Sequence, residues 1–358
     1  MAVAVERANG PVNGIVASQS ATGTKTDTPI LETPQSINVV TRQEIQQQGA
    51  ETLVQATRYV SGVNGDIYGP GSVFDNEIKI RGFVAPRYLD GLRLPYDTTI
   101  TFAQPRVELY GLERIEVLKG PSSGIYGQAA PGGILNMVSK RPTIEQRGEV
   151  ELQTGSYDRI QGAFDFSGPL DKNREFLYRI VGLARDTDTF VDFNHDKRYF
   201  IAPSFTWAPT TDTSITLLGS AQQDRRDGQV HQYLPGYGTL YSNPNGRIPT
   251  SRNSGEPGFD RVKFDQAFLG YEFRHRFNDA VEFRQNLRVG QVDVDMVSMR
   301  NGSGLCPTLA DPSCYGFNPA NFDPAQRVTV RDANFVGGST KNFTIDNQLQ
   351  ANFATGWL

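Results

Sequence analysis

The stretch that decides the fold runs from Leu112 to Pro142, LERIEVLKGPSSGIYGQAAPGGILNMVSKRP. Aliphatic and β-branched residues predict one strand at Ile115 to Leu118 and a second at Ile134 to Val138. The residues between them are rich in Gly and Pro, so the backbone is expected to pass through tight turns with positive φ angles. The stretch contains no recognisable catalytic side chain, so its role is expected to be structural.

Composition excludes a helical membrane protein and argues against nucleic acid as a partner. Of the 358 residues 38% are hydrophobic. No run approaches the roughly 18 apolar residues of a membrane helix. A transmembrane barrel is not excluded, because its strands alternate apolar and polar residues and give a hydropathy like the value of −0.43 found here. The net charge of −4 gives no electrostatic basis for binding nucleic acid.

The periodicity of the chain changes near residue 147. Before it, short strand patterns mix with helical ones, and Thr41 to Glu44 is a capping box that begins a helix closed by Gly49. A second helix is expected from Leu53 to Tyr59. After Arg147 apolar and polar residues alternate in eight segments up to residue 353.

The connections between these eight segments are unequal in length. They are short at 168–174, 208–213 and 277–280 and long at 223–262 and 299–338. Short turns at one end and long loops at the other are typical of an outer-membrane barrel. A soluble β-sandwich would have strands of about five or six residues and more even loops.

No enzyme site or metal centre is recognised in the sequence. The three histidines, His195, His231 and His275, lack metal-ligand spacing. No G-x-S-x-G element occurs, and Lys119 to Ser122 does not follow the phosphate-loop pattern. We therefore expect a protein that is not an enzyme and that has no cofactor.

Three motifs in order carry a resemblance to a known family: Thr33 to Ile37 (TPQSI), Ile80 to Phe83 (IRGF) and residues 112–142. Together they resemble the plug domain of TonB-dependent outer-membrane ferric-siderophore receptors, especially the ferrichrome-type (hydroxamate) receptors. The resemblance implies a mixed α+β plug domain at 29–146, followed over 147–358 by the first strands of an antiparallel transmembrane β-barrel.

The family's function is TonB-dependent uptake of a ferric siderophore across the bacterial outer membrane, in which iron arrives already chelated. The implied partners are the siderophore, TonB with ExbB and ExbD, and outer-membrane lipid. An alternative from another class is a secreted β-rich binding or adhesion protein without transport activity.

Residues 1–28 are small and polar and predict a flexible leader. In the family such a leader carries the TonB box, which pairs with TonB as an added strand. Ala2 to Val5 is a candidate, and a plain disordered tail is the other interpretation. Met1 to Glu6 does not have the basic and apolar regions of a signal peptide, so an outer-membrane location implies a mature or trimmed form.

The resemblance places the ligand on outward plug loops and beneath aromatic residues of the barrel. The loops correspond to 66–75, 84–88 and 94–103, and the segment 229–235 corresponds to an aromatic-rich part of the barrel. The expected siderophore contacts are Tyr68, Arg87, Tyr96, Phe102, His231 and Tyr233. His231 replaces a tyrosine of the family, and Asn301 and Ser303 stand where the family has further tyrosines, which weighs against ferrichrome itself.

The resemblance also assigns structural roles to four residues. Arg81 and Lys119 match basic plug residues that pair with barrel glutamates and anchor the plug, and Lys119 stands where the ferrichrome receptors have arginine. Either residue could instead be a solvated surface charge. Cys306 and Cys314 lie in a long Gly/Pro-rich loop, where a local disulfide or two unpaired thiols are the alternatives, and the family's loop disulfide favours the first.

The number of predicted strands bears on completeness. A barrel that holds a plug of this size belongs to the class of about 22 strands, whereas eight strands enclose only side chains. We therefore expect the eight strands to form a curved, unclosed sheet beside the plug, with the chain an N-terminal portion of a longer receptor.

Overall fold

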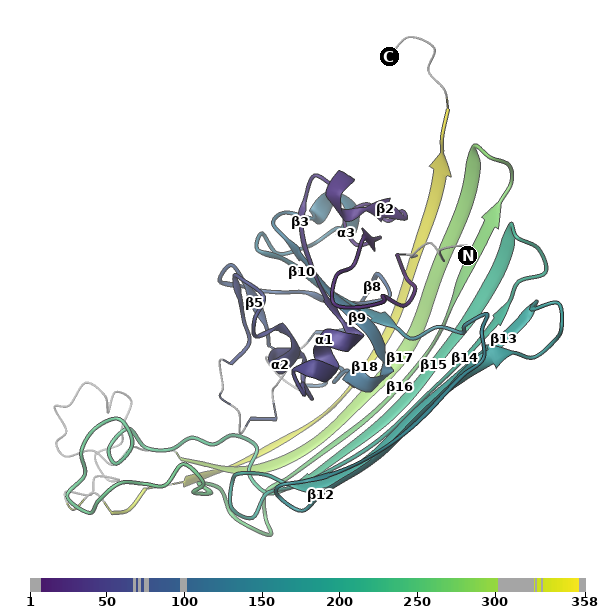
Figure 1. Ribbon diagram of the computed structural model, residues 1–358. Helices are drawn as coiled ribbons and strands as arrows, with labels where there is room; N and C mark the ends of the chain where they lie inside the picture. Colours follow the sequence, from purple (N-terminus) through teal and green to yellow (C-terminus); the bar gives the residue numbers. More distant parts are fainter. Residues whose placement is uncertain are drawn as a thin grey trace.

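The computed structural model describes residues 8–66, 69, 72–73, 77–96, 102–301, 325, 327–329 and 331–353. Its dominant feature is one antiparallel sheet, here called the wall, in which each strand pairs with its neighbour in the sequence (Figure 1). The strands are β11 (Arg147–Gly155), β12 (Arg159–Pro169), β13 (Phe176–Asp188), β14 (His195–Trp207), β15 (Thr213–Asp227), β16 (Arg261–Arg276), β17 (Val281–Asn301) and β18 (Arg331–Ala351).

The wall is strongly curved, and the part of the chain that precedes β11 lies against its concave side (Figure 1). β11 and β18 are the two edges, and they do not pair with each other within the described residues. Several strands are longer than the alternation predicts: β17 extends to Asn301 and β18 begins at Arg331, so both continue beyond the bilayer-length segments read from the sequence.

The two faces of the wall differ in polarity, as the period of two predicts. On β18, Phe335, Phe343 and Leu349 are 69%, 63% and 70% exposed on the face turned away from the plug. Asp346, of opposite parity, points to the plug side and pairs with Lys25. An apolar convex face is what a hydrocarbon environment requires of a membrane strand. Within the described part of the chain, no helix has the length and apolarity needed to cross a bilayer.

The plug is built around the stretch from Leu112 to Pro142. Its central strands are β9 (Leu112–Lys119) and β10 (Gly133–Ser139), joined through the one-turn helix α3 (Ser123–Tyr126). They lie in a five-stranded sheet of order β3-β9-β10-β7-β8, with β3 (Ser36–Thr41), β7 (Arg87–Leu89) and β8 (Leu92–Arg93). A smaller sheet contains β4 (Val63–Asn64), β5 (Lys79–Ile80) and β6 (Phe83–Val84).

Two short helices cover the plug sheet, and both begin at threonine caps. The Thr41 hydroxyl accepts the amide of Glu44 at 3.2 Å and begins α1 (Arg42–Gln47). The Thr52 hydroxyl accepts the amide of Gln55 at 3.2 Å and begins α2 (Leu53–Thr57), which ends two residues before the predicted Tyr59. Such caps satisfy amides that have no partner within the helix. The 3₁₀ turns η1 (Ile30–Glu32) and η2 (Leu109–Gly111) complete the elements.

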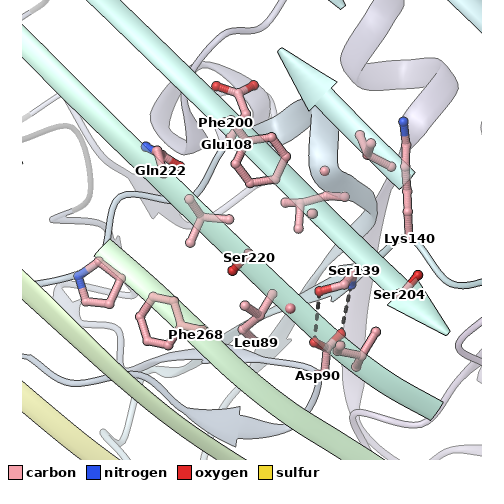
Figure 2. A pocket seen from close by; sticks show the side chains of 18 of the residues that line it. Leu89, Asp90, Glu108, Ser139, Lys140, Phe200, Ser204, Ser220, Gln222 and Phe268 are labelled. Atoms are coloured by element: carbon pink, nitrogen blue, oxygen red, sulfur yellow. Dashed lines mark hydrogen bonds between the residues drawn. The ribbon is translucent and has the colours of Figure 1, made fainter. Parts of the chain in front are cut away.

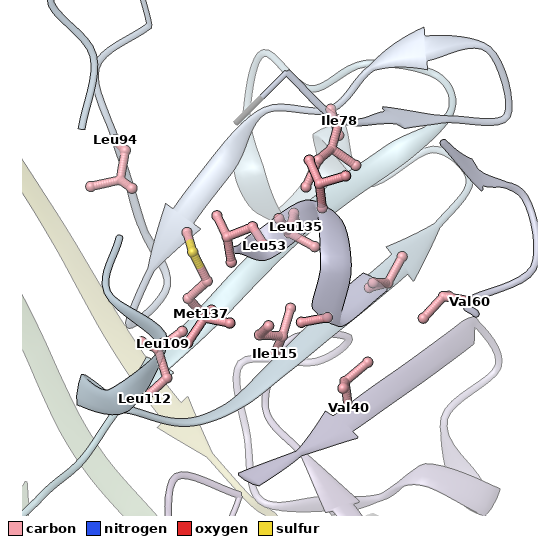
Figure 3. Packing of buried hydrophobic residues seen from close by; sticks show 14 of the residues in the cluster. Val40, Leu53, Val60, Ile78, Leu94, Leu109, Leu112, Ile115, Leu135 and Met137 are labelled. Carbon is pink, nitrogen blue, oxygen red and sulfur yellow. The ribbon is translucent and has the colours of Figure 1, made fainter. Parts of the chain in front are cut away.

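The main apolar core lies between the helices and β9 and β10 (Figure 3). Ile115, Leu135 and Met137 are completely buried in it. The wall contributes Phe268 and Val292 to the same cluster. The plug and the wall therefore share one core, and apolar burial holds them together in addition to the polar contacts described below.

An N-terminal hairpin (residues 18–29), formed by β1 (Gln19–Ser20) and β2 (Thr28–Pro29), is docked on the plug. The hydroxyls of Ser20 and Thr22 both donate to one carboxylate oxygen of Glu116, which lies in β9. Asn136 in β10 donates to the Thr22 hydroxyl at 2.8 Å. These side chains are buried, so the docking contacts are shielded from water.

The hairpin corrects the prediction of a flexible leader through residue 28. Small polar residues indicate disorder when their only partner is water, but here a buried acid and a buried amide supply partners. Lys25 extends the hairpin to the wall through its ion pair with Asp346 at 3.0 Å. The candidate TonB box at Ala2 to Val5 lies outside the described residues.

Gly133 is a constrained position of the stretch from Leu112 to Pro142. Its φ is +132°, and a Cβ there would lie 2.1 Å from the carbonyl oxygen of Leu118. We expect Gly133→Ala to lower the free energy of opening of the β9–β10 pair by about 2 kcal/mol or more. Hydrogen exchange of the β9 and β10 amides measures that free energy.

Gly124 in α3 is the matched control, because a Cβ there would meet nothing within 4 Å. Gly124→Ala should change the opening free energy by less than about 1 kcal/mol. Equal effects of the two substitutions would show that the close approach at Gly133 is not a constraint.

Candidate functional site

The plug reaches the loop between β15 and β16 at the end of the wall that carries the long loops. The amide of Val73 donates to the carbonyl of Val230 at 3.0 Å. Next to it, the Ser72 hydroxyl lies 2.9 Å from Nδ1 of His231. This pair of contacts, here called the loop latch, joins a plug loop directly to an outer loop of the wall.

An apolar cluster lies beside the loop latch and joins a second plug loop to the wall. Val73 and Ala103 pack there with Val262 and Phe264 of β16 and with residues of β17, and Phe102 lies against the cluster. Phe102 has a φ of +53°, a conformation that is strained for a bulky residue. Strain of this kind persists only where surrounding contacts hold the loop in place.

The latch histidine lies beside an exposed tyrosine ring. The rings of His231 and Tyr233 are 5.0 Å apart, and Tyr233 is 42% exposed. Tyr96, in the predicted 94–103 plug loop, is 41% exposed. Of the six siderophore contacts predicted from the sequence, the structure brings His231 and Tyr233 together and leaves Tyr96 accessible. Tyr68 lies outside the described residues.

Arg87 is placed differently from the prediction. Its side chain is 3% exposed and lies under the plug loop, donating to the carbonyl of Pro105 and to Oε1 of Gln104, each at 2.8 Å. Two bonds to consecutive residues hold the base of that loop. The expectation of a ligand-facing Arg87 is therefore corrected to a supporting role, because the buried guanidinium satisfies loop acceptors.

Arg81 and Lys119 lie close together on the plug. Nζ of Lys119 donates to the Ser61 hydroxyl at 3.0 Å, and burial together with the charge of Arg81 lowers the pKa of Lys119. Among the described residues neither has an acidic partner from the wall. Their anchoring role stays a prediction, as does the Cys306–Cys314 disulfide, which falls outside the described residues.

The contacts that do anchor the plug to the described wall are buried ion pairs that sequence reasoning missed. Asp165 of β12 lies 2.8 Å from Lys140 and 2.8 Å from Arg179 of β13, and Arg42 of α1 reaches it at 3.1 Å. Burial and the positive charge of Arg42 lower the pKa of Lys140 to about 8, although Asp165 favours its charged form. This first group of ion pairs joins α1 and the end of β10, both in the plug, to β12 and β13 of the wall.

A second buried group joins the plug to β14 and β15. Arg198 of β14 donates to Glu108 of the plug at 2.8 Å and pairs with Asp224 of β15 at 2.5 Å. Arg106 of the plug approaches the same Asp224 at 3.3 Å. Charges on both sides are thereby compensated, which buried ions require.

The third group, here called the seam cluster, comprises Asp90, Arg141, Glu272 and Arg288. Asp90 follows β7 in the plug with a φ of +54°, in the Asp-Gly turn before β8. Burial would raise the pKa of Asp90, but Arg141, Arg288 and hydrogen bonds from Ser139 outweigh it and hold that pKa below its usual value. The only sequence signal was the Asp90-Gly91 turn, which does not reveal the partners.

Two hollows lie between the plug and the wall. The inner hollow, of about 60 Å³, is lined by Asp90, Leu89, Ser139, Lys140 and wall residues including Phe200 and Ser220 (Figure 2). The larger hollow, here called the vestibule, has a volume of about 1240 Å³. It reaches the end of the wall that carries the short turns, where Arg174 lines it. Asp90 borders both hollows.

The loop latch should depend on pH. Burial and the charges of Arg226 and Arg300 lower the pKa of His231 to about 4. A lowered folded-state pKa gives stability that is complete above about pH 6.5, the value for an unperturbed histidine, and that is lost as pH falls toward 4. We expect hydrogen exchange at Val73 and in residues 229–231 to rise, after correction for intrinsic rates, between pH 7 and pH 5.

His231→Ala should remove this pH dependence. His195→Ala, at the start of β14, is the control and should retain it. A pH response that survives His231→Ala would assign the effect to another group.

Comparison with known proteins supports the family suggested by the sequence. Residues 29–134 match the TonB-dependent receptor plug domain. The chain is 39% identical over 363 residues to the ferrichrome outer membrane transporter/phage receptor of Escherichia coli (strain K12), covering 98% of this chain and 47% of that protein. It is 33% identical over 358 residues to the ferrioxamine receptor of Yersinia enterocolitica, covering 99% and 47%. The chain thus spans about half the length of the curated relatives it matches.

Solved structures agree at the level of the fold. The ferric-catecholate import receptor Fiu from E. coli K12, in its open form, superposes with a TM-score of 0.80 at 24% identity, over 99% of this chain and 50% of that one. The ferripyoverdine receptor of Pseudomonas aeruginosa gives 0.81 at 22% identity, over 99% and 44%. These relatives do not favour a secreted adhesion protein. The plug in the concave face of an antiparallel wall and the matching relatives show that the chain belongs to the TonB-dependent outer-membrane siderophore receptors.

Proposed function

We propose that the protein takes up a ferric siderophore across the bacterial outer membrane, binding the chelate from outside and releasing it into the periplasm. The observation that carries the proposal is the docked plug, which fills the concave face of a wall whose other face is apolar. An outer membrane holds no nucleotide or ion gradient, so the energy would come from TonB, with ExbB and ExbD, through the N-terminal leader. Hydroxamate chelates are favoured, because the ferrichrome and ferrioxamine receptors are among the relatives.

The wall itself suggests how the transmembrane part is completed. β11 and β18 have unpaired edges within the described chain, and an unpaired edge in hydrocarbon costs several kcal/mol for each free backbone group. Further strands pairing with both edges would remove this cost and would close a barrel of about 22 strands around the plug. Acidic residues on such strands are the partners proposed for Arg81 and Lys119.

The proposed ligand site comprises five aromatic residues of the predicted ligand loops and of the loop latch: Tyr96, Phe102, His231 and Tyr233, with Tyr68 of the 66–75 loop. Aromatic faces and hydroxyls suit a bulky, weakly charged chelate, which needs shape and hydrogen bonds and no iron ligand from the protein. The strained Phe102 and the supporting Arg87 would keep the loop pre-arranged for binding.

Uptake is tested in cells that lack other siderophore receptors. Expression of the receptor should permit uptake of an iron-labelled hydroxamate chelate, and loss of TonB should abolish uptake while leaving surface binding intact. Titration of the purified receptor with a panel of ferric siderophores, followed by tryptophan fluorescence, would identify the class. Failure of every chelate to bind a folded receptor would refute the proposal.

Replacing Tyr96 and Phe102 together by alanine should weaken chelate binding by about 1–3 kcal/mol, because stacking area is lost. The same fluorescence titration measures the change. Phe343→Ala, on the outward face of β18, removes a ring of the same kind and should leave affinity unchanged. Equal affinity of the double variant and the unaltered receptor would remove these two residues from the site.

Cys306 and Cys314 should be bonded to each other in receptor isolated from the outer membrane, where no cytosolic reductant reaches them. Peptide mass spectrometry without reduction should find the linked pair. A short loop of this kind removes little chain entropy, so reduction should loosen the loop without unfolding the wall. Free thiols in the isolated receptor would contradict the pairing.

A further inference from the structure

The seam cluster stands where the inner hollow and the vestibule meet. Asp90 borders both hollows, Arg288 borders the inner one, and Arg141 and Glu272 border the vestibule. The four charged side chains therefore occupy the boundary between the small inner hollow and the vestibule, which reaches the short-turn end of the wall.

The bonds of the cluster cross the seam twice. Arg288 of β17 donates to Asp90 at 2.8 Å and to the carbonyl of Leu89 at 2.7 Å. Arg141 of the plug donates to Glu272 of β16 through Nε at 2.8 Å and through Nη2, and it also reaches Asp90 at 3.1 Å. Each plug residue thus holds one wall residue, and Arg141 links the two crossings.

Some of the wall residues on either side of the cluster have small side chains. Ser204, Gly219 and Ser220 line the inner hollow, and Ser214 and Thr216 line the vestibule. These residues leave space next to the plug along β14 and β15.

We propose that the seam cluster is a gate on the plug–wall seam: while its two crossings are intact the inner hollow is closed to the vestibule, and their separation joins the hollows into one passage along β15, β16 and β17. The four residues are positioning residues, since they act by holding the plug against the wall. The inference rests on the proposed uptake function for what would pass, a ferric chelate, but the closure itself is a property of the described contacts.

The electrostatics make this gate dependent on water. Asp90 and Arg288 are almost fully buried, with side chains 3% and 6% exposed. Separating such a pair without water leaves two uncompensated charges, which is strongly unfavourable. Separation becomes feasible when water from the vestibule solvates both partners, so opening and hydration of the passage occur together.

The test is the reactivity of a cysteine placed in the inner hollow. Ser220→Cys is introduced into the full-length receptor with Cys306→Ser and Cys314→Ser, reconstituted in nanodiscs, and its rate of reaction with a charged, water-soluble thiol reagent is measured. Glu272→Gln weakens one crossing while keeping the size of the side chain. We expect it to accelerate labelling on the order of tenfold or more, the effect of losing one charge-assisted hydrogen bond.

Asp212→Asn is the matched control, because it removes the partner of Arg276 in an exposed ion pair of a short turn away from the plug. Labelling should then proceed at the unaltered rate. Equal rates in the Glu272→Gln and unaltered receptors, or equal acceleration by Asp212→Asn, would overturn the gate.

Hydrogen exchange of β9 and β10 establishes that the plug of the Glu272→Gln receptor is folded. If it is not, Arg141→Lys takes its place, since lysine keeps the charge but cannot bond Glu272 and Asp90 together, and the same acceleration is expected. The assay contains neither siderophore nor TonB. A receptor that binds no chelate but shows the acceleration would refute the proposed function and leave the gate standing.

Discussion

The contact between plug and wall depends on one electrostatic constraint: a charge removed from water must meet an opposite charge. Arg179, Arg198 and Arg288 project from the concave face of the wall into a seam where each is at most 6% exposed. Every one of them meets a carboxylate of the plug, from Glu113, Glu108 and Asp90 respectively. The loss of either partner would leave a buried ion without an opposite charge. The plug strands and the wall strands therefore fix each other's positions.

This arrangement divides the work of association between two kinds of force. The shared apolar core, to which Phe268 and Val292 contribute, gives favourable burial without direction. The ion pairs fix the orientation of the plug, because a guanidinium that donates two hydrogen bonds to one carboxylate allows few relative positions of the two groups. A plug held only by apolar contacts could slide along the wall, whereas a plug held by three charged groups has one defined position on it.

The sequence predicted those parts of the fold that are set by local chemistry. The alternation after Arg147 predicted strands with one apolar face, and the capping residue Thr41 predicted where the first helix begins. It failed at the N-terminal hairpin, because the contacts of Ser20 and Thr22 with Glu116 join residues more than 90 positions apart. Small polar residues look disordered until such distant partners are known.

The candidate site was predictable only in outline. Loop positions and residue types indicated Tyr96 and Tyr233 as accessible aromatics, but nothing in the sequence separated an exposed Arg87 from the buried one observed. The loop latch was missed for the same reason as the ion pairs: Ser72 and His231 are 159 residues apart, and nothing in the sequence pairs these two residues. Side-chain pairing across a domain boundary depends on three-dimensional register, which period and composition do not encode.

The N-terminal hairpin has a mechanical consequence. Its contacts with Glu116, with Asn136 and, through Lys25, with Asp346 follow one another along the chain. A pull applied upstream of Ser18 would break these contacts one after another. The force required is therefore set by the strongest single contact and not by the sum of all of them. The Lys25 pair comes last in that order and is the only one of the three that ends on the wall. Tension would therefore act on the buried strands of the plug before it acted on the wall.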